Sequence, residues 1–94
     1  MSIGQKPIKD ERYTFETEWY DPQADIIRLY RLFFFPGDNS LEMFDKKMNR
    51  CFLKRVEAPT VSLKDFYIGA KVTVFSRVLT VASYGDIATH NKQN

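Results

Sequence analysis

The sequence has few of the residues from which most enzyme sites are built. It contains a single histidine, His90, which lies in the polar tail ATHNKQN, and a single cysteine, Cys51. This leaves no compact Cys/His or Ser/His/Asp set for nucleophilic catalysis. The four glycines stand far apart, at positions 4, 37, 69 and 85, so no glycine-rich phosphate loop or dinucleotide fingerprint is present. We therefore expect a domain with no catalytic site and no cofactor.

Other absences narrow the possible environment and ligands. One cysteine excludes an internal disulfide and a cysteine zinc site, and the acids stand singly rather than in a metal-binding pattern. No apolar run approaches the roughly 20 residues of a membrane span. The start, MSIGQKPIKDER, has no apolar signal-peptide core, which favours a cytosolic or nuclear address. The net charge of +2 is too small for a general nucleic-acid binder.

The composition that remains is that of one globular domain. Of 94 residues, 44% are hydrophobic, 15% are aromatic and 28% are charged, well away from the signature of a disordered chain. We expect a flexible lead over residues 1–11, a single domain over residues 12–89 and a short tail over residues 90–94.

Alternating apolar and polar residues predict a succession of strands. Residues 12–20 alternate with a period of two, and the turn DPQAD separates them from a longer apolar strand at residues 26–35. The turn PGDNS leads to strands at residues 41–45 and 51–56, with Phe52 and Leu53 on opposite faces. Four successive strands indicate an antiparallel meander.

The second half of the chain continues the β pattern. Ser62 and Asp65 are spaced as a helix N-cap and its capping-box acid, so one helical turn is expected there, ending near Gly69. Residues 71–76 and 77–84 are one bent strand or two short ones. About six strands and one helical turn predict a mainly β fold, either a small barrel or a bent sandwich.

The triple phenylalanine at residues 33–35 divides between two faces of its strand. Alternation places Phe33 and Phe35 on one side and Phe34 on the other, so at least one ring enters the core. The opposite face could be covered by a helix. We interpret this run as architecture rather than as a ligand grip or an exposed patch.

Charge is distributed unevenly along the chain. Residues 10–25 carry six acids against one arginine, whereas residues 46–55 carry five cations and no acid. We call these cations the basic hairpin, which consists of Lys46, Lys47, Arg50, Lys54 and Arg55. Two readings remain open for it, a solvated turn or a contact with an acidic partner.

Several motifs together resemble a known family. They are WYDP, FFPGD, EMFD, FLKR, FSR and YGD, and their order and spacing are those of DM-ten domains, named for doublet microtubules. The similarity runs from about Tyr13 to Thr89 and is strongest to the DM-ten copies that precede nucleoside diphosphate kinase modules.

The resemblance implies a fold, a location and a class of partner. DM-ten domains are similar to pleckstrin-homology domains, with a bent antiparallel sheet and a C-terminal helix, which would be short or truncated here. The family implies a cytoskeletal location in the ciliary or flagellar axoneme, with tubulin and other axonemal proteins as partners. Through the parent protein it also implies the γ-tubulin ring complex, at a basal body or centrosome. No catalysis is implied for the domain itself, because the setting of His90 does not match the phosphorylated histidine of the kinases. Arg77 and the YGD turn are expected to hold the fold.

The resemblance leaves three functions to weigh. The first is a docking module that uses the basic hairpin on tubulin or its neighbours, and the second is a module that regulates or positions a downstream kinase. Phosphoinositide binding is disfavoured, because the loop DPQAD carries Asp21 and Asp25 where related folds place cations.

Overall fold

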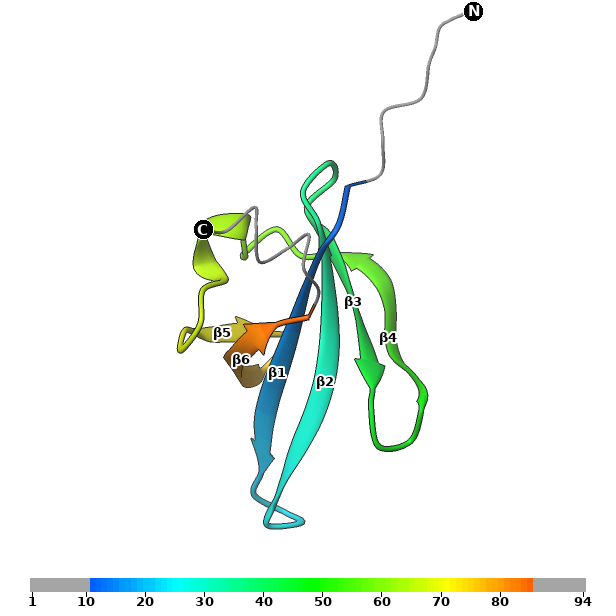
Figure 1. Cartoon of the computed structure of the whole chain (residues 1–94), viewed down its shortest axis with the longest axis vertical. Helices are drawn as coiled ribbons and strands as arrows, with labels where there is room; N and C mark the ends of the chain where they lie inside the picture. The colour runs from blue at the N-terminus through cyan, green and yellow to red at the C-terminus, as the bar shows by residue number, and fades with distance from the viewer. Residues whose placement is uncertain (1–10, 86–94) are drawn as a thin grey trace, which may run out of the picture.

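The computed structural model describes residues 11–85 as one antiparallel sheet with a single short helix (Figure 1). The expected tail, most of the expected lead, His90 and any C-terminal helix lie outside the described residues. The sheet has six strands in the spatial order β4-β3-β2-β1-β6-β5. In chain order the elements are β1 (Tyr13–Asp21), β2 (Ile26–Phe35), β3 (Ser40–Asp45), β4 (Arg50–Glu57), the 3-10 helix η1 (Leu63–Asp65), β5 (Lys71–Val74) and β6 (Arg77–Tyr84). Among these residues no helix is long and apolar enough to cross a membrane.

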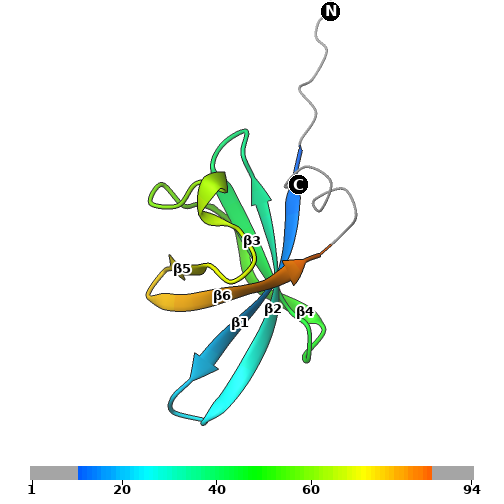
Figure 2. The same cartoon turned by 60° about the vertical axis from the view of Figure 1, so that its left-hand side comes forward.

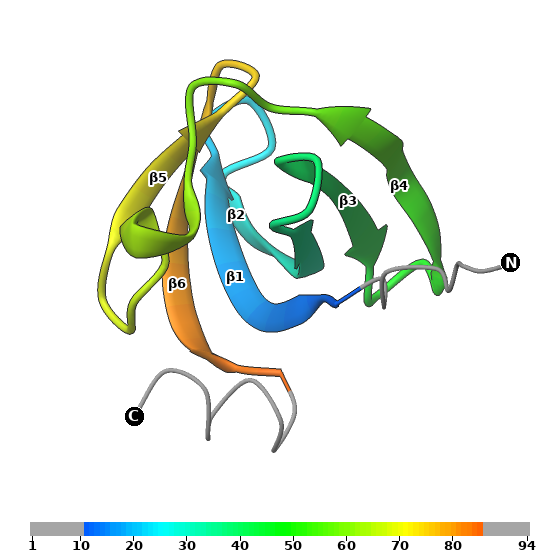
Figure 3. The same ribbon diagram turned by 90° about the horizontal axis from the view of Figure 1, so that it is seen from above.

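The expected mainly β fold and the meander of β1 to β4 are confirmed. Each of these strands pairs antiparallel with the next, and β6 returns to pair with β1. The sheet is strongly curved, and β4 and β5 form its two free edges (Figures 2 and 3).

The hydrophobic core fills the concave face of this curved sheet. Phe15, Leu32 and Phe34 are fully buried there, together with apolar residues of β3, β5 and β6. Phe66, directly after η1, stacks on Phe15 with ring centroids 4.9 Å apart and also lies 5.2 Å from the Phe34 ring. The η1 segment is anchored in the core in this way, and the Ser62 amide donates to the Asp65 carboxylate at 2.9 Å, as the capping pattern predicts.

The three phenylalanines divide as alternation predicts, but a different kind of group covers the outer face. Phe34 lies in the core, whereas Phe33 and Phe35 point to the convex side. The guanidinium of Arg12 lies 4.7 Å from the Phe33 ring centroid, and that of Arg55 lies 3.6 Å from the Phe35 centroid. Within the described chain, two arginines thus cover these rings through cation–π contacts where a helix was considered.

Strand β4 departs from the simple alternation that its sequence suggests. Its register against β3 shifts twice, once on each side of Met43, so β4 contains extra residues relative to its partner. The Phe52 ring reaches Tyr30 with centroids 4.6 Å apart, while Leu53 also packs against the core. The expectation that Phe52 and Leu53 face opposite sides is therefore wrong, because a bulge turns neighbouring residues to the same side.

Residues 71–84 form two strands joined by a tight turn. Phe75 and Ser76 connect Val74 to its partner Arg77, and both have positive φ, 47° and 74°. This is the backbone of a primed hairpin turn, which suits the sheet twist but normally recruits asparagine and glycine. A phenylalanine with positive φ has a strained backbone. The Phe75 side chain is half exposed, so burial of its ring offsets little of this strain.

Two motif residues make contacts that fit the structural role expected for them. The Arg77 guanidinium lies 4.8 Å from the Trp19 ring centroid and 5.0 Å from that of Phe52. It thereby joins β6 to β4, which are not neighbours in the sheet. Gly85 donates its amide to the Thr14 carbonyl at 2.6 Å, and a Cβ at this position would collide with the Thr14 side chain.

Candidate partner-binding surface

The basic hairpin lies on β4 and on the connection that leads into it. The connection is a tight turn in which the Asp45 carboxylate accepts the Met48 amide at 3.0 Å and Asn49 adopts φ 57°. All five cations of the hairpin are exposed, but they do not form one uniform patch.

Lys46 is engaged by an acid of β1, two strands away from β3. Its ammonium lies 2.9 Å from one carboxylate oxygen of Glu16, while Arg31 donates to the other oxygen at 2.9 Å. Partial burial raises the pKa of Glu16, but hydrogen bonds from the two cations outweigh it and the net pKa is lowered. Lys46 is therefore held on the convex face of the sheet.

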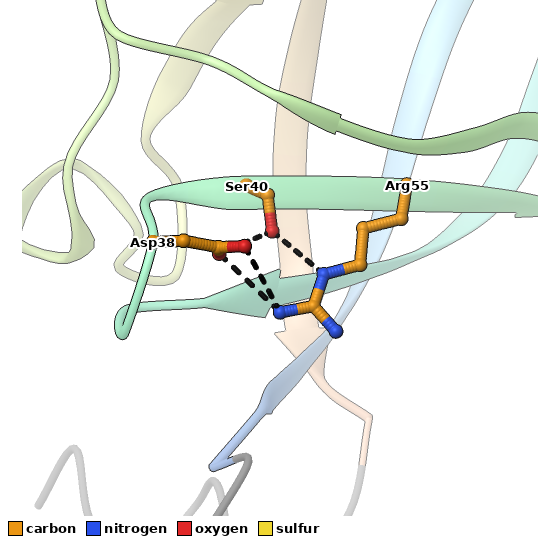
Figure 4. Close-up of polar contacts among 3 residues, drawn as sticks. All are labelled: Asp38, Ser40 and Arg55. Atoms are coloured by element: carbon orange, nitrogen blue, oxygen red, sulfur yellow. Dashed lines mark hydrogen bonds and ion pairs between the residues drawn. The ribbon is translucent and has the colours of Figure 1, made fainter.

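Arg55 is occupied at the opposite end of β4 (Figure 4). Its Nε donates to the Ser40 hydroxyl at 2.8 Å and its Nη2 lies 3.3 Å from the Asp38 carboxylate, while the guanidinium covers Phe35. The Ser40 hydroxyl also donates to Asp38 at 2.5 Å. Hydrogen bonds from Ser40 and Arg55 lower the pKa of Asp38, so the acid stays charged.

The other three cations of the basic hairpin are available. Among residues 11–85, Lys47, Arg50 and Lys54 are exposed and no acid pairs with them. The five residues singled out in the sequence thus divide into two with intramolecular roles and three that can meet a partner. Sequence alone could not make this division, because Glu16 and Asp38 are distant along the chain from the cations they bind.

The β1–β2 turn, residues 21–25, has the opposite charge. Asp21 accepts the Gln23 amide at 3.0 Å and Arg28 Nε at 2.8 Å, and Tyr20 donates to Asp25 at 2.6 Å. The hydrogen bond from Arg28, opposed by a smaller desolvation effect, lowers the pKa of Asp21. The nearest cation is thus committed to the turn itself, which argues against an anionic lipid at this loop.

One apolar surface was not anticipated from the sequence. Tyr20, Ile27 and Val78 are 53%, 60% and 50% exposed at the end of the sheet near the β1–β2 turn. They border a groove of about 590 Å³ between that hairpin and the β5–β6 hairpin. The apolar residues on both faces of β2 were the available signal, but they do not indicate which side chains stay uncovered.

The described residues include a charged hairpin and an exposed apolar groove. No three His, Cys, Asp or Glu side chains between residues 11 and 85 are placed to hold a metal ion. One curved, open antiparallel sheet with a charged hairpin defines a pleckstrin-homology-like module.

Comparison with known proteins then gives the particular family. The family model of the nucleoside diphosphate kinase 7 N-terminal PH domain matches residues 7–94, and the chain belongs to that family. Nucleoside diphosphate kinase homolog 7 of Mus musculus is 50% identical over 78 residues, and that of Rattus norvegicus is 47% identical over 78 residues. Each match covers 83% of this chain but only 20% of the relative. The chain is therefore a non-catalytic N-terminal domain, distinct from the kinase part of such proteins.

Proposed function

We propose that this domain docks its parent protein onto tubulin, or onto proteins beside it, inside ciliary doublet microtubules. The observation that carries the proposal is the set of three available cations, Lys47, Arg50 and Lys54, on one hairpin. The resemblance to DM-ten domains supplies the ciliary setting, and a γ-tubulin complex at the basal body or centrosome is a related partner of the parent.

Charge complementarity supports an acidic partner for this hairpin. Exposed ion pairs contribute only about 0–1 kcal/mol each and weaken as salt rises. One domain would thus bind weakly, and firm attachment would come from many contacts in an ordered lattice. An axonemal doublet is such a lattice.

Co-sedimentation of the 94-residue chain with microtubules tests the proposal. The double variant Lys47→Glu with Arg50→Glu is expected to weaken binding about tenfold, because two attractions become repulsions. The matched control, Lys64→Glu with Lys71→Glu, reverses two exposed charges elsewhere and changes the net charge equally. It should bind within about twofold of the wild type.

The outcome distinguishes a hairpin contact from general charge attraction. Equal weakening in both double variants would show that only net charge matters. No pelleting by the wild-type chain at low salt would remove tubulin as the direct partner.

A second candidate function is to position or regulate a kinase within the same chain. It is favoured by the size of the curated relatives, since this chain spans about one fifth of their length. Nucleoside diphosphate kinase rates of the longer protein, with and without residues 1–94, provide the test. A rate that is unchanged by the deletion would argue against this role.

A further inference from the structure

The sheet ends at β5, and one side of this strand is open. Among the described elements only β6 pairs with β5. The two-residue turn closes on the pair Val74 and Arg77, and hydrogen-bonded pairs then recur at every second residue, at Val72 and Leu79. The main-chain groups of the residues between them, Lys71 and Thr73, therefore point away from β6 towards the free edge.

A groove lies along this free edge. It has a volume of about 390 Å³ and is lined on one side by Lys71, Val72 and Thr73. The other side is lined by residues before and after η1, including Val61 and Tyr67. Two amides and two carbonyls, spaced two residues apart, face this space. An extended polypeptide is the ligand whose own donors and acceptors repeat at that spacing.

The side chains around the groove indicate what kind of peptide fits. The Lys71 ammonium has one hydrogen-bond partner in the described chain, the Thr80 hydroxyl at 3.4 Å. The nearby Asp65 carboxylate is already engaged by the Ser62 amide. An acidic residue is therefore favoured at the position of an added strand that lies opposite Lys71. An apolar residue is favoured at the next position, which would face Val61 and Tyr67.

From these observations we propose that the β5 edge binds an extended segment of a partner protein as a seventh strand, with an acidic residue opposite Lys71 and apolar residues beside it. This site is separate from the basic hairpin, since β4 and β5 lie at opposite ends of the sheet. Binding at the β5 edge and binding at the basic hairpin can consequently be tested independently of each other.

The test uses a capped heptapeptide of alternating valine and glutamate as the probe, titrated to millimolar concentrations into the isotopically labelled 94-residue chain. We expect the largest amide shifts at Lys71 to Val74. Thr73→Pro removes a donor at the free edge but none that pairs with β6, and should weaken binding at least about tenfold. Thr73→Val retains the amide and is the matched control, with binding expected within about twofold of the wild type.

Charge and backbone readouts make the test independent of any single variant. Lys71→Glu should reverse the preference, so that a valine–lysine heptapeptide binds more tightly than the valine–glutamate one. The valine–glutamate peptide with alternate amides N-methylated along its bonding edge should not bind the wild-type chain. This second probe decides the question even if Thr73→Pro fails to fold.

Three results would overturn the inference. They are an absence of shifts at β5 at millimolar peptide, equal binding by the N-methylated peptide, or concentration-dependent dimerisation that Thr73→Pro abolishes. The last result would mean that a second copy of this chain, rather than a peptide, occupies the edge.

Discussion

The two edge strands of the sheet, β4 and β5, differ in length, regularity and charge. Strand β4 has eight residues, two register shifts and the cations Arg50, Lys54 and Arg55. Strand β5 has four residues in regular register and one charge, Lys71. Bulges and charges disfavour the addition of another strand, whereas a regular edge beside a groove permits it. The difference suggests that the module presents charge at one edge and backbone at the other.

The sharpest test of this comparison places proline at two adjacent positions of β5. Val72→Pro removes a hydrogen bond to β6 as well as a buried side chain, and should lower the free energy of unfolding by about 3 kcal/mol or more. Thr73→Pro removes an outward donor only, and should cost less than about 1 kcal/mol. Urea unfolding followed by tryptophan fluorescence measures both, since Trp19 packs against the core.

Equal losses in the two proline variants would break the comparison. They would show that the Thr73 amide is already paired in the folded chain, and that the β5 edge is closed. Thr73→Val again serves as the control, because it retains the amide and the β-branched shape.

The edges also show what the sequence could and could not predict. Alternation predicted the strands and the division of the three phenylalanines between two faces, because a period of two follows directly from strand geometry. Turn residues predicted the hairpin at PGDNS. Alternation failed at Phe52, because a bulge depends on pairing with β3 rather than on the sequence of β4 itself. Alternation also gives no indication that Ile27 is exposed, because the apolar content of a strand does not reveal whether another layer covers it.

The candidate site also combines features that the local sequence predicts with features that depend on residues far apart in the chain. The sequence identified the five cations, but which of them remain available depends on Glu16 and Asp38, which meet Lys46 and Arg55 only in the folded sheet. The free amides of β5 had no signal in the sequence, because an edge is defined by the order of strands.

The next largest effect is expected at the occupied end of β4. Arg55→Ala removes the bonds to Ser40 and Asp38 and uncovers Phe35, and should destabilise the fold by about 2 kcal/mol. Arg55→Lys retains the charge but loses the planar stack and the forked donors, so about half of that loss is expected. Lys54→Ala, one residue away and without a partner among residues 11–85, is the matched control and should unfold like the wild type.

The effect of Arg55→Ala should also depend on pH. Because the folded pKa of Asp38 is lowered from its ordinary 3.8, its contribution is present above that value and is lost as pH falls through the folded pKa. The stability difference between wild type and Arg55→Ala should thus shrink between neutral pH and about pH 2. A difference that stays constant over this range would assign the role of Arg55 to the Phe35 stack and the Ser40 hydrogen bond rather than to Asp38.

The smallest effect has the opposite sign and concerns the β5–β6 turn. Phe75→Asn together with Ser76→Gly places residues that tolerate positive φ in a turn that requires it, and should stabilise the fold by about 1 kcal/mol. Little packing is lost, since Phe75 is half exposed. The comparison variant is Asn49→Gly in the β3–β4 turn, where asparagine already suits a φ of 57°, so the midpoint of urea unfolding should hardly move. A loss of stability in the double variant would mean that the Phe75 ring contributes more by its contacts than its backbone costs in strain. The Phe75 ring would then help to stabilise the β5–β6 hairpin and with it the β5 edge. The contrast between β4, which is stabilised by side-chain contacts, and β5 would accordingly be smaller.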